Sequence, residues 1–594
     1  MNTSFKKLAF FLTLALLSLA IQQLCLAGSA TWSSNPTSGD WITAANWLPQ
    51  TVPNSPTDVA TFGASDTTAV SITNTDIDLD SAVFSSGAPP YTITFQIPGL
   101  EDHNLSFYGA GIINNSGVMQ SVVLSNASVA FVKISFYNTA STGEMTTYST
   151  TAGGNYVFYD SSSAGTATFN LTGGLGGTVL EFIGSSTAAD AAINASGGAT
   201  VIFSDSSVGS NATVNLAASS YLEFLGSSNA EHLKVNCNEG YAISFLGTSN
   251  AGDGTYTVNP GQTTMQFANE VYFADSATAG NATFILDGSM GAGFLNSTLL
   301  FFGSSTAANA NVIAYGGSND GPGAAIEFHS RTDGGTGSFT LLGNSILDIS
   351  KHLPAPVTLG SLSGSGTVNL GARTLALGSN NANTTFSGVI KDSGGMSQST
   401  RGSMSKLGSG TLILTGTNLY TGGTTVSAGV LKVANTTGSG TGSGSVNVNA
   451  GTLGGSGIIA GATAIGNGSG GVAFLAPAVG TSKQATLTIQ SALSFNSDAT
   501  YTCTFQAKKN RARTDLVVAN GVTITGASLN LSGQTQGNLK PGLTLTLISN
   551  TSATPISGTF SNLPDGGTVT INGNNFQASY EGGDGNDLTL TVVP

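Results

Sequence analysis

Short runs of alternating apolar and polar residues recur along most of the chain. Examples are TLALG at 374–378, TLILTG at 411–416 and SLNLSG at 528–533. Alternation with a period of two is typical of a β-strand with one buried face, and a helical period is nearly absent after residue 30. Residues that favour turns, chiefly Gly, Ser, Thr and Asn, separate the runs. The pattern predicts an all-β protein made of many short strands.

A phenylalanine followed by small polar residues recurs through the middle of the chain, in blocks such as EFIGSSTAA, IFSDSSVGS and EFLGSSNAE. These phenylalanines are Phe158, Phe182, Phe203, Phe224, Phe245, Phe273, Phe301 and Phe328, with gaps of 24, 21, 21, 21, 28, 28 and 27 residues. A second block, such as GTATFNL or SNATVNL, follows the first at a similar offset. The middle of the chain is therefore an imperfect repeat.

A period of this length indicates stacked supersecondary units. Propeller blades need roughly 40–50 residues, and leucine-rich repeats need a Leu/Asn ladder that is absent. A coil of about 21 residues suits a parallel β-helix with three faces, each a strand of about four residues plus a turn. The phenylalanines should then point inward and stack in one column, with successive Cα atoms about 5 Å apart in parallel strands.

Aspartates or glycines follow the phenylalanines by two positions. Asp160, Asp205 and Asp275 are the aspartates, and Gly fills intervening copies. A row of aspartates is compatible with a metal site, but Asp and Gly alternating at one position is typical of a corner turn. We therefore interpret these residues as turns.

The N-terminus has the features of a secretory signal. Lys6 and Lys7 precede an apolar run from Leu8 to Ile21, and small residues allow cleavage after Ala27 or Ala30. The run is shorter than the roughly 20 residues of a spanning helix, which disfavours an uncleaved anchor. No later stretch has 18 consecutive apolar residues, so we expect no second membrane helix.

Charge limits the classes of partner. Charged residues are 8% of the chain, and the formal net charge of −14 becomes −16 once the two signal lysines are removed. An acidic exported protein is not drawn to nucleic acid or to anionic membrane. One basic cluster, KKNRAR at Lys508–Arg513, is interpreted as a solvated turn between strands, with a polyanion-binding patch as the alternative.

Two cysteines, Cys237 and Cys503, follow the signal. Two cysteines in a large exported chain do not make a disulfide framework, and their spacing fits no metal motif. In one continuous solenoid they would lie roughly 50 Å apart, beyond the about 7 Å limit for a disulfide. Both should be thiols.

The stretch KLGSGTLILTGTNLYTGGTTVSAGVLKV, Lys406–Val433, resembles the autotransporter-associated β-strand repeat, also called the passenger-associated transport repeat. Matching positions include Lys406, Gly408, Asn418 and Tyr420. The segments on either side, the Trp-containing start of the mature chain and its C-terminal end are similar to the same class of exported proteins. The resemblance implies a parallel β-helix passenger outside a bacterial envelope and implies no active site.

Several expectations follow from the repeat and the resemblance. The fold should be an all-β, right-handed parallel β-helix with a β-rich C-terminal region. The expected parts are a signal peptide at 1–30, an N-terminal β cap at 31–100, β-helix coils at 101–350, the autotransporter-associated repeat region continuing the β-helix at 351–475, and a C-terminal β region at 476–594. The strands after Val433 do not resemble the membrane barrel of such proteins, so a separate export route is expected.

Catalytic chemistry finds little support. The four histidines, His103, His232, His329 and His352, are not at metal-ligand spacing. Glu327, His329 and Arg331 are candidates for a polysaccharide lyase or hydrolase, but the sequence does not place them in one cleft.

The segment EGGDGNDLTL, Glu581–Leu590, matches the start of a calcium-binding β-roll turn. Such sites need two stacked copies and only one is present, so a terminal hairpin turn is the favoured interpretation.

We therefore assign no catalytic, cofactor-binding or metal residue and expect no cofactor. The favoured function is an exported, surface-associated or secreted structural or adhesin-like β-solenoid, extracellular or on the outer cell surface. Glycans or copies of the same chain are the partners that its low-charge surface suits. The alternative is a β-helix enzyme, a lyase or glycoside hydrolase, acting on extracellular polysaccharide.

Overall fold

The computed structural model describes residues 28–97, 99, 101–126, 132–151, 153–174, 177–238, 242–260, 269–395 and 400–594. The chain forms two compact units, unit 1 (Met1–Tyr256) and unit 2 (Thr257–Pro594). Apart from one 3-10 turn, Ala44–Asn46, the regular structure within these ranges is all β-strand. No helix found there is long and apolar enough to cross a bilayer. The all-β prediction is confirmed, whereas the signal sequence up to residue 27 lies outside the described residues.

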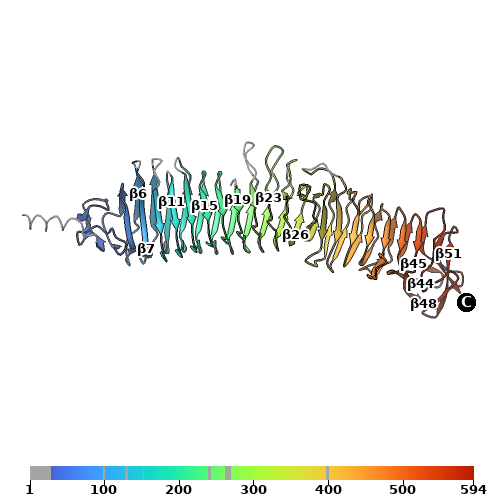
Figure 1. Ribbon diagram of the computed structural model, residues 1–594. Coiled ribbons are helices and arrows are strands. Elements are labelled where there is room, and N and C mark those ends of the chain that lie inside the picture. Colours follow the sequence, from blue (N-terminus) through green and yellow to red (C-terminus); the bar gives the residue numbers. More distant parts are fainter. Residues whose placement is uncertain are drawn as a thin grey trace, which may run out of the picture. The chain divides into compact units, whose positions relative to one another are not determined.

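Unit 1 consists of coils that each contribute strands to two parallel sheets (Figure 1). Its first sheet contains β3 Val59–Phe62, β5 Ile77–Phe84, β7 His103–Asn114, β9 Val132–Phe136, β11 Gly154–Phe158, β13 Thr178–Phe182, β15 Thr200–Phe203, β17 Tyr221–Phe224 and β19 Ala242–Phe245. Its second sheet contains β4 Ala69–Thr73, β6 Thr92–Ile97, β8 Gln120–Asn126, β10 Thr146–Thr150, β12 Thr168–Thr172, β14 Ala192–Ser196, β16 Thr213–Leu216 and β18 Lys234–Cys237. The last strand, β20 Thr255–Val258, lies at the boundary of the units.

The repeated phenylalanines form an inward column in unit 1. Phe182, Phe203, Phe224 and Phe245 occupy one register position in parallel strands and are 0% exposed. Successive ring centroids are 4.7–4.8 Å apart, with interplanar angles of 4–6°. The predicted column is confirmed, and its aromatic stacking contributes beyond simple burial.

The third face of the coil is shorter than predicted. Instead of a four-residue strand it holds one bridging residue per coil, as in the parallel bridge between Val208 and Asn229. Asp205 and Ser210 on either side of Val208 have φ of 56° and 48°, so the chain turns twice within six residues. A residue in the left-handed region cannot continue a strand, and this is why the third face shrinks.

The corner interpretation of the aspartates is confirmed. Asp160, Asp205 and Asp275 have φ of 57°, 56° and 53°. Gly184 and Gly303, which fill the same position in other coils, have φ of 73° and 67°. Asp tolerates this conformation because its side chain bonds local backbone groups, and Gly because it has no Cβ.

The N-terminal end of unit 1 is filled by aromatic side chains. The strands β1 Ala30–Trp32 and β2 Trp47–Leu48 are antiparallel to each other, and β1 is parallel to β3. Trp32, Trp41 and Trp47 are at most 1% exposed, and their rings lie 5.8–6.3 Å from that of Phe62. This aromatic cluster gives the first coil a packed neighbour.

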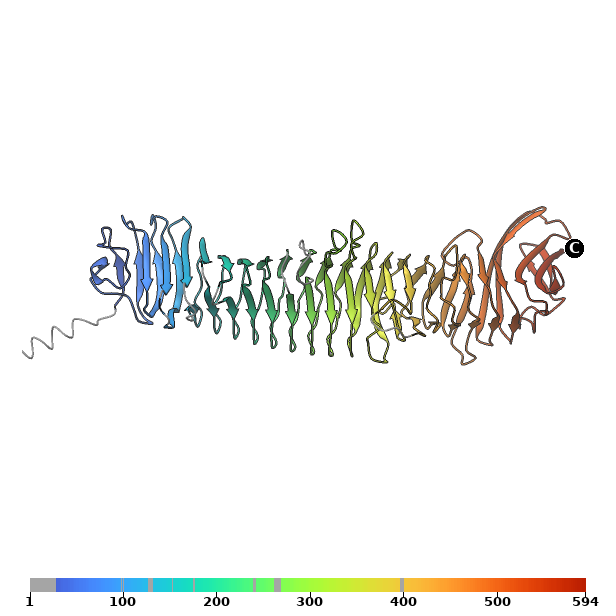
Figure 2. The same ribbon diagram turned by 90° about the horizontal axis from the view of Figure 1, so that it is seen from above.

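Unit 2 has the same two-sheet coil design within itself (Figure 2). Its first sheet contains β21 Glu270–Phe273, β23 Thr298–Phe301, β25 Ala325–Phe328, β27 Ile346–Asp348, β29 Thr367–Asn369 and β32 Val389–Lys391. Its second sheet contains β22 Thr283–Leu286, β24 Asn311–Ala314, β26 Gly334–Leu341, β28 Val357–Gly364, β30 Thr374–Leu377, β31 Thr384–Phe386, β33 Ser403–Lys406, β34 Thr411–Leu414, β35 Thr424–Val426, β36 Val430–Val433, β37 Val446–Val448, β38 Gly451–Gly455, β40 Thr463–Ile465, β41 Ala473–Ala476, β43 Leu493–Phe495, β44 Ala499–Lys508, β45 Arg511–Thr514, β47 Val522–Ile524 and β48 Ser528–Gln536.

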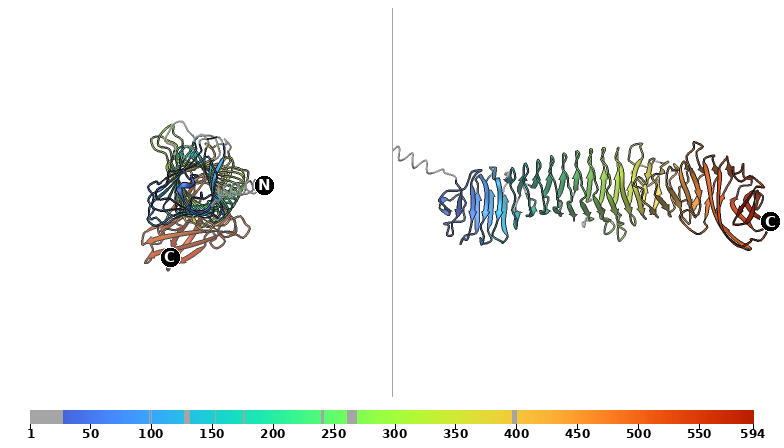
Figure 3. Two further views of the ribbon diagram at one scale, coloured as in Figure 1. Left: turned by 90° about the vertical axis from the view of Figure 1, so that its left-hand side faces the viewer. Right: turned by 90° about the horizontal axis from the view of Figure 1, so that it is seen from below.

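A further sheet lies in the C-terminal part of unit 2 (Figure 3, orange to red). In sheet order it contains β39 Ile458–Ile459, β42 Thr486–Ile489, β46 Leu516–Ala519, β49 Thr544–Asn550, β52 Asp587–Val593, β51 Asn574–Gly582 and β50 Thr568–Ile571. The last strands pair antiparallel, so parallel coiling ends in a hairpin region.

Both cysteines are buried thiols, as predicted. Burial raises the pKa of Cys503 to about 12. This thiol therefore stays protonated and unreactive at neutral pH.

Candidate functional site

The stretch Lys406–Val433 contributes strands to two successive coils of unit 2. Its strands β33 and β34 pair in parallel with β35 and β36 respectively. Leu412, Leu414, Leu431 and Val433 point inward and are at most 3% exposed. The alternation that suggested strands thus places the apolar side chains in the core.

The lysine that opens this stretch is buried. Lys406 is 1% exposed, and its Nζ donates to the carbonyl oxygens of Leu407 at 2.5 Å, Gly408 at 3.0 Å and Ala428 at 3.4 Å. Burial lowers the pKa of its ammonium group to about 8. The side chain satisfies carbonyls of two successive turns, which is a structural use of a charge.

Asn418 bonds to both neighbouring coils, whereas the Tyr420 hydroxyl bonds within its own coil. The Asn418 Oδ1 accepts the backbone N–H of Ile390 at 2.8 Å, and its Nδ2 donates to the carbonyl of Gly440 at 2.6 Å. Tyr420 is fully buried, and its hydroxyl lies 2.6 Å from the Thr424 Oγ1. The Asn418 amide therefore bridges the coil before it and the coil after it.

The paired glycines of this stretch have different roles. Gly423 has φ of 97°, whereas a Cβ on Gly422 would meet the carbonyl oxygen of Arg401 at 2.2 Å. Gly423 therefore occupies a backbone conformation that favours glycine, and Gly422 is needed because the neighbouring backbone approaches closely.

Glu327 and His329 form the nearest approach to a chemical site in unit 2. They stand two residues apart along the chain, and His329 Nε2 lies 2.9 Å from Glu327 Oε2. The side chains are 16% and 12% exposed. Arg331 follows a turn at Ser330, whose φ is 56°, and makes no ion pair with Glu327 among the described residues. The structure therefore unites two of the three candidates.

Aromatic rings and a second carboxylate surround this pair. The Phe302 ring stacks on His329 with centroids 4.3 Å apart, and Tyr272 contacts Phe302 at 5.2 Å. Burial raises the pKa of Glu270, and the negative charge of Glu327 raises it further. The result is a half-buried patch with aromatic and acidic character.

Asp348 occupies the register position next to Glu327 on the following strand. It is 8% exposed, and its Oδ1 accepts the Ser350 backbone N–H at 2.8 Å. Two carboxylates therefore stand on adjacent strands, with one of them engaged in a local turn.

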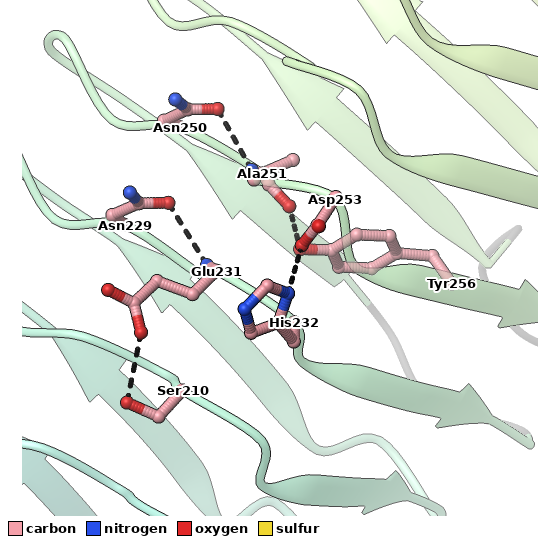
Figure 4. Close-up of polar contacts among 9 residues, drawn as sticks. Ser210, Asn229, Glu231, His232, Asn250, Ala251, Asp253 and Tyr256 are labelled. Atoms are coloured by element: carbon pink, nitrogen blue, oxygen red, sulfur yellow. Dashed lines mark hydrogen bonds and ion pairs between the residues drawn. The ribbon is translucent and has the colours of Figure 1, made fainter.

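The remaining histidines make separate contacts. His103 Nδ1 lies 3.4 Å from an Asp76 carboxylate oxygen, and the His352 ring contacts backbone carbonyls. His232 and Asp253 form an exposed pair with 2.5 Å between Nδ1 and Oδ1 (Figure 4). Nowhere in the described ranges do three or more His, Cys, Asp or Glu side chains gather as metal ligands.

Unit 1 carries an outer tyrosine ladder that the repeat analysis did not single out. Tyr108, Tyr137 and Tyr159 follow the inward phenylalanines by one residue and stack at 4.8 and 4.6 Å, with angles of 5° and 3°. Their faces cover one another, so the ladder presents mainly ring edges and hydroxyl groups outward. The signal that could have revealed it is the recurrence of FY in SFYG, SFYN and VFYD.

An asparagine ladder runs along the second sheet of unit 1. The Nδ2 groups of Asn194, Asn215 and Asn236 each donate to the Oδ1 of the preceding asparagine, beginning at Asn170, over 2.8–2.9 Å. Each donating amide has a second N–H besides the one used in the ladder. The coils therefore repeat a polar group on the surface at the strand spacing.

The C-terminal segment Glu581–Leu590 forms a hairpin turn, as favoured. Gly582 pairs with Asp587 between β51 and β52, and Gly583 and Gly585 have φ of 62° and 110°. Asp587 Oδ1 accepts the Asn550 backbone N–H at 2.8 Å. The aspartate that the calcium motif would use is therefore engaged within the fold.

The basic cluster Lys508–Arg513 lies on an exposed hairpin. Strand β44 ends at Lys508, β45 begins at Arg511, and the two pair antiparallel. The predicted turn between strands is confirmed.

Comparison with known proteins identifies one segment. Residues 404–433 match the family model described as passenger-associated-transport-repeat, which confirms the resemblance of this stretch. The search of curated proteins gave no match. Together with the parallel β-solenoid, the repeat fits a passenger-like structural protein, and it is associated with exported autotransporter passengers.

Proposed function

We propose that this protein is an exported, surface-associated or secreted β-solenoid with a structural or adhesive role. The observation that supports the proposal is the passenger-associated repeat, because its residues from Lys406 to Val433 pack into the wall of the β-solenoid. A repeat whose charged and aromatic residues are buried within and between coils acts as a structural scaffold.

The outer surface supports adhesion through many weak contacts. The asparagine ladder leaves an amide N–H at each step, and the tyrosine ladder offers hydroxyls at similar spacing. A linear array of identical groups suits a repetitive partner such as a glycan, because several weak contacts then act together.

Export is tested by expressing the full chain in a bacterium and sequencing the N-terminus of the mature protein. We expect cleavage after Ala27 or Ala30 and digestion of the protein by protease added to intact cells or to the medium. A full-length chain retained inside the cell would contradict the proposal.

Adhesion is tested by incubating the mature protein with a panel of polysaccharides, measuring both binding and product release. A variant with Asn194→Ala and Asn215→Ala should lose binding, whereas Asn35→Ala, on an exposed loop away from the ladder, should not. Equal binding by both variants would exclude the asparagine ladder as the contact surface.

A polysaccharide-active enzyme is the second candidate, supported by the Glu327–His329 pair and by Asp348 on the adjacent strand. Carboxyl groups about 5–10 Å apart are the requirement for glycoside hydrolysis. Product release by the wild type that is abolished in Glu327→Gln, with binding kept, would favour this function over adhesion alone.

A further inference from the structure

The net charge of the protein is concentrated in unit 1. From residue 28 to residue 256 the sequence has 17 Asp and Glu against two Lys, a formal charge of −15. Residues 257–594 have 14 acidic and 13 basic side chains, a formal charge of −1. One unit is therefore strongly acidic, while the other is close to neutral.

Within unit 2, cations gather on one face of the hairpin at 499–514, which we term the basic face. Lys508 is the register partner of Arg511, and Gln506 is that of Arg513. On the other side of β44, Gln534 and Gln536 of β48 extend the same two rows. All six side chains are exposed, and side chains two apart share one side of a strand.

Two more lysines flank the basic face. Lys509 is in the hairpin turn, and its carbonyl accepts the backbone N–H of Lys540 at 2.7 Å. Both residues are exposed. The face and its border thus carry five cations.

No carboxylate in the described residues neutralises these cations. The ion pairs recorded there all involve histidines. Asp515, at the base of the hairpin, is 1% exposed, and its Oδ2 accepts the backbone N–H and the hydroxyl of Thr504 at 2.8 and 2.9 Å. The five cations therefore face solvent with their charge uncompensated.

Unit 1 offers a complementary surface along its first sheet. Glu181 and Glu223 occupy the same outward position two strands apart, which is about 10 Å. Asp160 and Asp205 lie exposed at the corners that follow β11 and β15, the neighbouring strands of the same sheet. Four carboxylates thus repeat along the wall. Burial raises the pKa of Glu181, whereas the charge of Lys133 lowers it.

We propose that the basic face of one copy docks on this acidic wall of unit 1 in a second copy. The two surfaces differ from each other, so the contact is head to tail, and a pair of copies keeps one free basic face at one end and one free acidic wall at the other. Such heterologous contacts extend into linear assemblies when they do not close into a ring. The inference rests on the proposed structural or adhesive function and names its partner.

The experiment measures sedimentation of the full mature chain at several concentrations and salt levels. We expect association at 0.05 M NaCl and an at least about tenfold weaker apparent affinity at 0.5 M, because salt screens exposed charges. A variant with Lys508, Lys509, Arg511 and Arg513 each changed to Gln should stay monomeric. A matched control with Arg331, Lys351, Arg401 and Lys483 each changed to Gln loses the same charge from exposed positions of unit 2 and should associate like the wild type.

A mixing experiment tests the head-to-tail geometry. The variant with Gln at positions 508, 509, 511 and 513, here called the hairpin variant, still has its acidic wall but has no basic face. It should therefore terminate chains and lower the mean mass of wild-type assemblies at substoichiometric ratios. Association of the hairpin variant at the wild-type level overturns the inference, as does a wild type that stays monomeric at low salt. Dextran sulfate bound by that monomer but not by the hairpin variant would assign the basic face to an anionic polysaccharide instead.

The two proposals fail separately. A chain that is exported and binds glycans but remains monomeric overturns the head-to-tail contact alone. A chain that associates through the basic face in solution but is retained inside the cell overturns the proposed export alone.

Discussion

Replacing Lys406 with Met removes a buried ammonium while keeping a long, flexible side chain. The variant leaves the carbonyls of Leu407 and Gly408, now 2.5 and 3.0 Å from Nζ, without their donor. An unpaired buried acceptor costs about 1–3 kcal/mol, and loss of the ammonium's own desolvation cost returns part of this. We expect the local free energy of unfolding to fall by about 2–4 kcal/mol at pH 7.

The pH dependence gives this prediction a sign. Burial lowers the pKa of Lys406 from its ordinary value of 10.5 to about 8. Between these values the unfolded chain holds a proton that the folded chain has released, so stability rises with pH through this window. Below pH 8 both states are protonated and the cost of the buried charge is present in full. The advantage of the wild type over Lys406→Met should therefore widen between pH 8 and 10.

The assay is hydrogen exchange of peptides covering β33 to β36 in the full chain, because coils contact mainly their neighbours and open locally. Lys432→Met is the matched control, since Lys432 is half-exposed on β36 and makes one bond of 3.3 Å to the carbonyl of Val479. It should change local stability by less than about 0.5 kcal/mol. Wild-type exchange rates in Lys406→Met at pH 7, or a gap that narrows as pH rises, would refute the reasoning.

Three further predictions use the same local exchange measurement, supported by limited proteolysis. Tyr420→Ala should cost about 3–5 kcal/mol as a large-to-small core change, while Tyr420→Phe should cost only about 1 kcal/mol for the bond to Thr424; equal losses would assign the whole effect to the hydroxyl. Gly423→Val should open the local coil because φ of 97° strains a β-branched residue. The control Gly63→Val should be tolerated, since its φ lies outside that region and an added Cβ would have no described atom within 4 Å. A tolerated Gly423→Val would contradict the turn geometry. Ser207→Ala should be neutral or stabilising because this buried hydroxyl has no hydrogen-bond partner among the described residues. Ser305→Ala loses a 2.8 Å bond to the Phe302 carbonyl and should cost about 1 kcal/mol; the reverse order would show that the Ser207 hydroxyl is hydrogen-bonded in solution.

Features that repeat at fixed spacing were predictable from sequence. The column through Phe182 and Phe203 follows from a 21-residue period, because a register error would move the ring to the other face of the strand. Glu327 and His329 were candidates from the sequence, but nothing in the sequence placed them in contact, and His329 lies just beyond the end of β25. The position of a residue within the repeat was therefore enough to predict its strand and the face on which it lies.

Features that depend on one turn or one contact were not predictable. The third face shrinks because Ser210, which has no strong preference for positive φ, adopts 48°. Lys406 stood at the polar end of a strand, where a charge is normally solvated, yet its Nζ reaches carbonyls of two turns. The burial of such a charge depends on three-dimensional neighbours that the strand pattern does not contain.

The equal coils of unit 1 have a consequence for how this protein can vary. Between Phe182 and Phe245 every coil has 21 residues, and the described strand residues pair with their counterparts in the coils before and after them in parallel register. Loss or duplication of one whole coil would leave the phenylalanine column, the asparagine ladder and every corner in phase, whereas a change of any other length would displace them. Changes in the gene that add or remove a whole coil are thus neutral steps for the fold, and they alter the number of surface groups the protein displays while leaving the groups themselves unchanged.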